Sequence, residues 1–464
     1  GSREAMIKFL RAHTQLLGII VVWIFTTLYL GPLIYLILPA SVFLFRRSEL
    51  WADMIFGFLL ILILSDMSPE FFEMRKIKSA KYTYIIALSL IFLLETQRFM
   101  PLSRVFTIFL PFFVYSFLPL MQSSDVLNGV SKTISYALLY LIIPNYVLMN
   151  FRRQGWLFMR NFLFFIVTVL VFGYAILYVQ PGWVMIGGRF RGLFGNPNGL
   201  GIFCYVTFML AYVVNFMNPR VFNRIDKIIV FGVIGFVLIK CGSRTSVVAS
   251  TMFLVFGRFF SLSPFLGFVA FIAFIGIAEL ISSNLAAIVM AFGLEKFFRV
   301  ETLEDGSGRY FAWNFAWEKI NKGGFLVFGG GFGNDEWVMR HNYKFLRSQG
   351  HHGGVHNSYL TMWFNTGAVG ILLYFRSYAL LFFKANKLVP VAFAVMFSSM
   401  FSVLYESWLT GSLNPFSIIL VIIMTLLSED DIVHDLSRRE EARLEQEGAN
   451  AEVVPLIGDV MLRR

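Results

Sequence analysis

Long apolar stretches recur from one end of this chain to the other, and they restrict its fold more than any other feature. A stretch of about 20 apolar residues can cross a bilayer as a helix, because a helix satisfies its own backbone hydrogen bonds. The chain is 57% hydrophobic and 14% charged, whereas soluble domains carry about 25% charged residues. The sequence therefore predicts an all-α polytopic membrane protein with about 12–14 transmembrane helices.

Candidate spans end where charged or turn-forming residues interrupt the apolar runs. Gly31-Pro32 is either a kink within one long helix or a turn between two helices. The spans are expected near residues 16–30, 32–45, 52–66, 82–95, 104–121, 131–150, 157–180, 199–217, 228–241, 243–260, 264–281, 357–382, 388–407 and 415–428.

The distribution of Lys and Arg predicts which loops face the cytoplasm. The net charge of +11 is therefore attributed to cytoplasmic loops and anionic lipid headgroups rather than to nucleic acid. Counting back from the basic tail by alternation, the cytoplasmic groups are Lys8/Arg11, Arg46/Arg47, Arg98/Arg104, Arg152/Arg153/Arg160, Arg220/Arg224/Lys227, Arg258, Lys384/Lys387 and Arg438/Arg439/Arg443. One short loop disagrees, because Arg75, Lys76, Lys78 and Lys81 fall outside. Either a span is miscounted there, or this loop has an anionic ligand of its own.

Five regions follow from these spans. They are amino-terminal transmembrane helices (6–180), transmembrane helices with arginine-bearing outer loops (181–281), a large outer loop that contains helices (282–355), carboxy-terminal transmembrane helices (356–428) and a charged cytoplasmic tail with a helical stretch (429–464). Met6 is the expected native start. No cleavable signal peptide is expected, because the first apolar stretch is too long and lacks a small-residue cleavage site.

Four arginines are predicted on the outer side, at or near helix ends, although the positive-inside rule disfavours them there: Arg189, Arg191, Arg244 and Arg309. The planar guanidinium group carries a permanent charge and binds phosphate oxygens, so four of them around one site would hold a diphosphate. The alternative is that they reach lipid headgroups or pair with the outer acids Asp305, Asp335 and Glu336.

Two outer segments are rich in glycine. In RGLFGNPNGLG (191–201), Asn198 is expected to cap the following helix, and the small residues let the backbone approach a ligand. GGGFGN (329–334) is expected to be a flexible hinge. Between them, SGRYFAWNFAWEKI (307–320) places Phe311/Phe315 and Trp313/Trp317 four residues apart, which predicts a helix on the membrane interface or under a lid.

Four of the six histidines lie in the large outer loop or at its end: His341, His351, His352 and His356. His352 and His356 have the spacing of a helical metal site, but Gly353-Gly354 between them argues against a helix, and no metal is expected. His356 opens the next span, so a helix end fixes it, and it can act as a general base. Its alternative role is to cap that helix or to face lipid. Glu406, near the outer end of its span, is expected to pair with an arginine or to orient His356.

The ordered set of motifs resembles the O-antigen ligase/polymerase superfamily over roughly residues 185–410. The motifs are FRGLFGNPNGLG (190–201), GSRTS (242–246), SGRYFAW (307–313), GGGFGN (329–334) and HNSYLTMWFNTGAVG (356–370). The resemblance implies a GT-C-type glycosyltransferase of the bacterial inner membrane whose active site faces the periplasm. Its donor would be a glycan on undecaprenyl diphosphate, and it would need neither a metal nor another cofactor.

Carried onto this chain, the resemblance gives each matching residue a role. Arg189, Arg191 and Arg244 would bind the donor diphosphate, with Arg191 fitting the family pattern better than Arg189. Arg309 would bind diphosphate or glycan in the catalytic centre, and His356 would accept the proton of the attacking hydroxyl, with inversion at the anomeric carbon. Asn198, Asn357, Tyr359 and Glu406 are the supporting candidates.

Three functions stay open. The segment GLFGNPNGLG resembles polymerases of O-antigen and exopolysaccharide type more than ligases. This resemblance favours a polymerase of lipid-linked repeat units, for which a chain-length regulator is an expected partner. An O-antigen ligase, which transfers the glycan to lipid A–core, differs in acceptor and not in site chemistry. A flippase or transporter of lipid-linked glycans is disfavoured, because transporters show internal repeats and polar groups near the bilayer midplane. The bilayer is an expected partner in every case.

Overall fold

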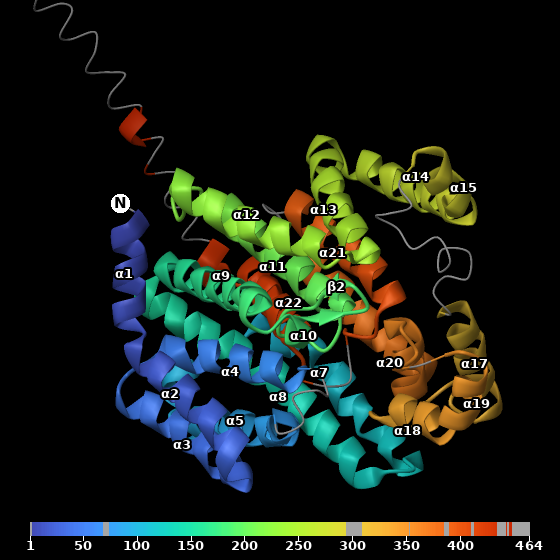
Figure 1. Ribbon diagram of the computed structural model, residues 1–464, viewed down its shortest axis with the longest axis horizontal. Coiled ribbons are helices and arrows are strands. Elements are labelled where there is room, and N and C mark those ends of the chain that lie inside the picture. Colours follow the sequence, from blue (N-terminus) through green and yellow to red (C-terminus); the bar gives the residue numbers. More distant parts are fainter. Residues whose placement is uncertain are drawn as a thin grey trace, which may run out of the picture.

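The computed structural model describes residues 2–67, 74–293, 309–351, 353–384, 389–409, 413–433, 442 and 445–447 (Figure 1). Helices dominate these ranges, and one short antiparallel pair of strands pairs Met185 with Phe190. The elements are α1 (Ser2–Ala12), α2 (Thr14–Phe25), η1 (Thr26–Leu30), η2 (Gly31–Leu33), α3 (Ile34–Arg47), α4 (Trp51–Ser65), α5 (Arg75–Leu94), α6 (Thr96–Phe99), α7 (Arg104–Ser116), η4 (Leu118–Gln122), α8 (Val126–Gln154), α9 (Trp156–Val179), α10 (Pro181–Val184), β1 (Met185–Ile186), β2 (Arg189–Phe190), α11 (Pro197–Met217), α12 (Arg224–Lys240), α13 (Arg244–Leu262), α14 (Pro264–Ser283), α15 (Leu285–Ala291), α17 (Arg309–Lys322), α18 (Asn334–His341), α19 (Tyr343–Ser348), α20 (Ser358–Phe383), α21 (Val389–Tyr405) and α22 (Pro415–Ser428).

Each apolar stretch that the sequence singles out coincides with a helix, and the prediction of an all-α polytopic membrane protein is confirmed. Within the described ranges, 8 helical stretches are long and apolar enough to cross a membrane, and four shorter apolar helices accompany them.

The chain turns back on itself at Gly31. The indole nitrogen of Trp23 in α2 donates to Ser41 in α3 at 2.9 Å, although the two residues are 18 positions apart. In one straight helix they would be separated by about 27 Å. Gly31 has φ +55°, which a residue with a side chain rarely adopts. Gly31-Pro32 is therefore a turn between two helices and not a kink within one.

The helix that the sequence places at 82–95 begins earlier, at Arg75. The basic residues that were expected in an outer loop therefore occupy the first turns of α5. Lys76 and Lys78 are exposed, and a long basic side chain that is buried can still reach a polar group. The ε-ammonium group of Lys81, for example, donates to the carbonyl of Leu413 at 3.1 Å.

The span expected at 357–382 is not one straight helix. α20 contains a sharp turn at Gly367, which has φ +69° and ψ −171°. The rings of Tyr359 and Phe375 lie 5.4 Å apart, whereas a straight helix would separate them by about 24 Å. The first part of α20 therefore folds back along the second part. The tyrosine hydroxyl donates to the carbonyl of Met400 in α21, which ties the first part to the bundle.

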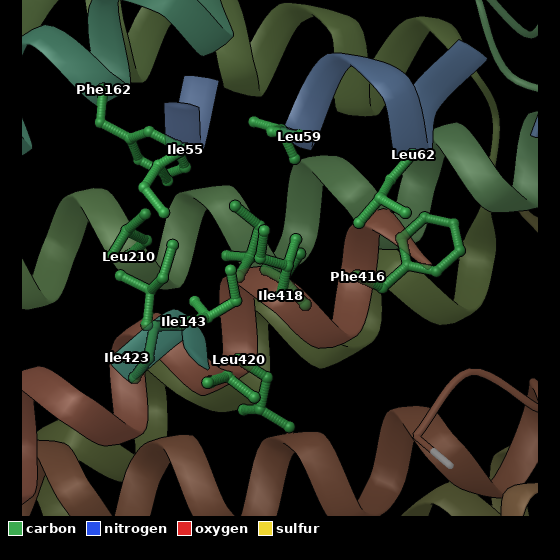
Figure 2. Close-up of a cluster of buried hydrophobic side chains, with 14 of the residues drawn as sticks. Ile55, Leu59, Leu62, Ile143, Phe162, Leu210, Phe416, Ile418, Leu420 and Ile423 are labelled. Carbon is green, nitrogen blue, oxygen red and sulfur yellow. The ribbon is translucent and has the colours of Figure 1, made fainter. Parts of the chain in front are cut away.

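α22 lies at the centre of the bundle and is apolar on every side, as expected for a fully surrounded helix. All of its residues except Ser428 are buried. Its side chains pack against helices that include α4, α8 and α11, and Figure 2 shows Ile423 beside Ile143 of α8 and Leu210 of α11. Between apolar helices in lipid, close packing holds such a core together, since lipid tails are as apolar as the side chains.

Charged side chains from loops far apart in sequence meet at one end of the bundle. Arg46 pairs with Glu95, Glu49 pairs with Arg153, and the start of the tail pairs with Arg104 and Arg152. The glycine-rich loops, α17, α18 and α19 belong to the opposite end, where α17 and α18 contact α20 (Figure 1). This division agrees with the sidedness predicted from Lys and Arg, while the compartment that each end faces stays a prediction.

Candidate active site

Three of the predicted site residues form a connected chain at the end of the bundle opposite the charged loops. The guanidinium group of Arg309 donates to Oε1 of Glu406 at 2.9 Å, and Nδ1 of His356 lies 3.3 Å from Oε2 of the same carboxylate. The arginine and glutamate side chains are 16% and 14% exposed, and the histidine is 33% exposed. A shielded ion pair thus lies beside a more accessible imidazole, and Glu406 contacts both the arginine and the histidine, while its role stays a prediction.

Arg309 and His356 are far apart in the sequence, with the glycine-rich segment expected to be a hinge lying between them, but the structure brings both side chains to Glu406. Arg309 is the first residue of α17, and the indole nitrogen of Trp313, one turn later, donates to the carbonyl of His356 at 3.3 Å. The aromatic spacing that predicted this helix therefore serves two purposes. Phe315 faces a small buried cluster, while Trp313 faces the site and also packs against Tyr405.

Hydroxyl and amide groups fix the loop that carries Glu406 to the start of α20. Ser358 donates to the carbonyl of Glu406 at 2.7 Å, and the backbone N–H of Asn357 donates to Ser407 at 2.9 Å. The side chain of Asn357 accepts from the N–H of Leu360, which makes this asparagine the N-cap of α20. Asn357 therefore performs the capping that was the alternative role for His356, and the imidazole remains available.

The backbone of His356 is held in the left-handed region, with φ +54°. For a residue with a side chain this conformation costs about 1–3 kcal/mol and persists only where its surroundings enforce it. His351 helps to enforce it. Its Nε2 lies 2.9 Å from the carbonyl of Gly354, and its ring lies 5.8 Å from the ring of His356. The backbone thus aims the imidazole rather than leaving it to rotate at a helix end.

The contacts also assign the two ring nitrogens of His356. A carboxylate only accepts hydrogen bonds, so Nδ1, facing Glu406, carries a proton, and in the neutral ring the lone pair is then on Nε2. A side chain at position 353 would begin 3.0 Å from Nε2, and Gly353 leaves that space open. Burial acts to raise the pKa of Glu406, but the hydrogen bond and charge of His356, together with Arg309, lower it below its usual value. The site therefore presents a basic nitrogen backed by a carboxylate.

A second group of predicted residues surrounds the turn between α12 and α13. Arg189 in β2 donates through Nε to the carbonyl of Cys241 and through a terminal nitrogen to Asn198, at 3.1 Å each. Arg244 begins α13 and is partly exposed. Position 201 of α11 lies so close to Ser243 that a side chain there would collide with it, which explains the glycine. The loop before α11 and the turn before α13 are therefore packed together.

The sequence predicted Asn198 as the cap of α11, and this prediction is wrong. The cap is Asn196, whose side chain accepts from the N–H of Gly199 at 2.7 Å, followed by Pro197 in the first helical position. Asn414-Pro415 starts α22 in the same way. Asn198 lies two positions beyond the cap, in the first turn of the helix, and its carbonyl oxygen accepts from Arg189 instead.

Arg191 differs from the other arginines because it is 1% exposed. Its Nε donates to the carbonyl of Trp183, and its backbone N–H donates to Val184. In this conformation the guanidinium group fixes the loop between α10 and β2 rather than facing the outside. The expected contact of Arg191 with a diphosphate stays a prediction, as do the roles of Arg189 and Arg244.

The segment GGGFGN is not a free hinge. The N–H groups of Gly330 and Gly331 donate to the carbonyls of Phe364 and Asn365, and position 329 has no room for a side chain against Thr366. The glycines let this backbone pack directly on the turn within α20. Glu336, in the helix that follows, pairs with Lys132 at 2.7 Å and not with an arginine. Asp305, a possible partner of the outer arginines, and His352, considered for a metal site, lie outside the described residues.

The structure adds residues that sequence reasoning missed. Ser358 and Ser407 contact the site, but serine is a common residue and no spacing marked either one. Trp313 and Gly353 were singled out for helix formation and against a metal site, and their contacts with His356 were not expected. Among the described residues, no group of three or more His, Cys, Asp or Glu side chains is placed to hold a metal ion.

One comparison with known proteins finds a family that matches part of the chain. Residues 229–375 match the family described as O-antigen ligase, and this match confirms the resemblance to the O-antigen ligase/polymerase superfamily. The matched segment includes Arg244, Arg309 and His356 but ends before Glu406. No curated protein matches the chain. The chain is thus a multi-pass membrane protein with similarity to enzymes of the O-antigen ligase and polymerase type.

Proposed function

We propose that this protein is a membrane glycosyltransferase that joins lipid-linked oligosaccharide repeat units, with His356 as its general base. The observation that carries the proposal is the chain from Arg309 through Glu406 to His356. A base oriented by a buried carboxylate, with its second nitrogen free, is the arrangement that proton abstraction from a hydroxyl requires. A lipid-diphosphate donor carries its own activation, so the reaction requires no nucleotide.

The proposed step is a single displacement. The oxygen of an acceptor-sugar hydroxyl forms a bond to the anomeric carbon of the donor as the bond from that carbon to the diphosphate oxygen breaks. The hydroxyl proton moves to Nε2 of His356, and the resulting imidazolium is stabilised by Glu406. The diphosphate leaves with the bonding electron pair, and the configuration at the anomeric carbon is inverted.

The arginines have the charge that the leaving diphosphate needs. Arg189 and Arg244 lie at adjoining helix starts and loops, and Arg309 lies beside the base. Charge that develops on the leaving group is stabilised best by donors already fixed in place. Arg189 meets this condition through its bonds to Cys241 and Asn198. We assign the diphosphate to Arg189 and Arg244. Arg191 fixes the loop between α10 and β2.

The acceptor decides between the two leading functions. The match to the O-antigen ligase family and the site contacts are compatible with both. The segment GLFGNPNGLG (192–201) resembles polymerases more than ligases. This resemblance favours polymerisation, in which the acceptor is a second lipid-linked repeat unit. Purified protein in nanodiscs, supplied with lipid-linked repeat units alone, should form a ladder of products. Product formation only after lipid A–core is added would assign a ligase instead.

Two histidine variants test the proposed site in that assay. His356→Ala should abolish the products, whereas His341→Ala should leave them unchanged. His341 is a matched control, because it is exposed on α18 and stacks on Trp337 away from the site. Movement of lipid-linked units across the membrane without any new glycosidic bond would favour the flippase alternative. A product ladder from His356→Ala would overturn the proposal.

A further inference from the structure

A cavity of about 700 Å³ lies between α4, α5 and the loop that leads into α11. Its volume is within the range of about 300–1,000 Å³ that is usual for small-molecule sites. Among the described residues, its polar lining includes Asp66, Lys78, Ser79, Tyr82 and Asn196. The rest of the lining consists of Ser65, Gly195 and the side chains of two methionines and a leucine. A lining of one cation, one acid, hydroxyls and an amide matches a charged, hydroxyl-rich molecule better than a lipid tail.

The cavity contains one of the lysines that disagree with the positive-inside rule. Lys76, Lys78 and Lys81 all occupy the beginning of α5, at the same end of the bundle as the candidate active site. Lys81 is 6% exposed and donates to Leu413, whereas Lys78 is exposed and lines the cavity. Lys78 thus presents a positive charge inside a pocket, which an anionic ligand would explain.

This pocket adjoins the candidate active site through two shared segments. Asn196, which lines the pocket, caps α11, and Asn198, two residues later, binds Arg189. On the other side, Lys81 binds Leu413, in the same connection between α21 and α22 that begins with Glu406. Asp66 lies against the start of α11, since a side chain at position 199 would contact its carboxylate at 3.5 Å. The start of α11 therefore lies between the pocket and Arg189.

We propose that this Lys78 pocket binds the diphosphate and first sugar of the acceptor, a second lipid-linked saccharide. The inference rests on the proposed function, because a polymerase must hold two lipid diphosphates at once, one as donor and one as acceptor. Arg189 and Arg244 then belong to the donor, and Lys78 belongs to the acceptor. The acceptor diphosphate is not a leaving group, so it does not have to be held in one orientation. A single flexible ammonium group is therefore sufficient to bind it.

The other lining groups have roles in this assignment. Ser79, Asn196 and the hydroxyl of Tyr82 can donate to or accept from sugar hydroxyls. Asp66 is the one acid, and burial raises its pKa to about 6, while Lys78 and Lys81 oppose that rise. A carboxyl group with such a pKa takes up a proton readily when an anion arrives, and it then becomes a hydrogen-bond donor.

The number of diphosphates bound per chain tests the inference without requiring activity. The probe is geranylgeranyl diphosphate, titrated calorimetrically into protein in nanodiscs of neutral lipid. The wild-type protein should bind two equivalents. Lys78→Glu should bind one equivalent, at the donor site, and Arg244→Glu should bind one equivalent, at the Lys78 pocket. Lys78→Gln, which removes only the charge, should weaken the affected site about 10-fold or more.

Lys76→Glu is the matched control, because it makes the same charge change two residues away on the same helix. Residues two apart face different sides of a helix, and Lys76 lies against the turn at Gly31 rather than in the pocket. It should still bind two equivalents. Two equivalents in Lys78→Glu would overturn the inference and leave the proposed function standing. No binding to the wild-type protein would overturn both.

Two competitors identify the source of the diphosphate. Inorganic pyrophosphate should displace the second equivalent only at much higher concentration than the prenyl compound, because it has no lipid anchor. Phosphatidylglycerol in the nanodisc should leave both equivalents in place. Displacement by phosphatidylglycerol would make the pocket a phospholipid site, and equal affinity for inorganic pyrophosphate would make it a site for free anions. Either result would overturn the assignment to a lipid-linked acceptor.

Discussion

Replacing Glu406 by Gln tests the most specific part of the site, because the change keeps the shape of the side chain and removes its charge. The carboxylate accepts from Arg309 and from Nδ1 of His356 at the same time. A glutamine has only one oxygen, which is uncharged, so it cannot accept from Arg309 and His356 through two separate oxygens as the carboxylate does. The tautomer of the histidine is then no longer fixed, and the imidazolium formed during transfer loses its counter-charge.

The size of the effect follows from these two losses. General-base catalysis contributes about 10²- to 10⁴-fold to rate, and all of it depends here on an available Nε2. We therefore expect kcat to fall about 10²- to 10⁴-fold, equivalent to about 2.7–5.4 kcal/mol in the barrier. Arg309 is 16% exposed, so leaving it unpaired should also cost about 1–3 kcal/mol of stability.

The assay is single-turnover transfer by purified Glu406→Gln with saturating lipid-linked donor and acceptor, alongside thermal unfolding. Glu318→Gln is the matched control, because Glu318 pairs with Lys322 on the exposed side of α17. Its ion pair is exposed to solvent and should contribute little to stability, and its transfer rate should be unchanged. A Glu406→Gln rate within about threefold of the wild type would refute the idea that this carboxylate orients the base.

Three further changes have defined outcomes. Gly353→Val should lower kcat about 10-fold or more in the same assay, because its side chain would occupy the space beside Nε2 of His356 and position 353 has φ +112°. Arg191→Ala should abolish transfer and lower the unfolding free energy by about 1.5–3 kcal/mol, because its buried guanidinium group donates to the carbonyl of Trp183. Arg244→Ala should instead raise KM for the donor at unchanged melting temperature. Equal behaviour of the two variants would contradict the assignment of a structural role to Arg191 and a donor-binding role to Arg244. The pKa of Glu406 is lowered in the folded protein, so its stabilising effect is complete above the unfolded value of 4.5 and is lost as the pH falls through the lower, folded value. Melting temperatures recorded from pH 7 to 3 should therefore fall more for the wild type than for Glu406→Gln, and parallel curves would contradict this reasoning.

The helices could be predicted from the sequence because each apolar run is long compared with its interruptions. The errors occurred where a local rule was applied without its neighbours. The sequence predicted a loop at residues 75–81, because four of them are basic. Basic residues are compatible with a helix, however, and α5 begins at Arg75 and includes all of them. The turn at Gly367 was missed because an apolar run does not show that its two halves pack against each other.

The site could be predicted in its residue types but not in its grouping. His356 stood out because it opens a helix, and Glu406 because a carboxylate near the membrane needs a partner. The sequence could not show that Arg309 joins them, since the segment between Arg309 and His356 could extend in many directions. It also could not separate Arg191 from Arg189, because the burial of one and the partial exposure of the other depend on how the loop folds.

The most direct test of the account is the single-turnover rate of glycan transfer by His356→Ala when the donor is shown to be bound. The variant should bind geranylgeranyl diphosphate as tightly as the wild type, because the histidine does not hold the diphosphate. Its rate of transfer should be about 10²- to 10⁴-fold lower. A His356→Ala variant that transfers glycan at the wild-type rate would contradict the claim that this imidazole removes the acceptor proton.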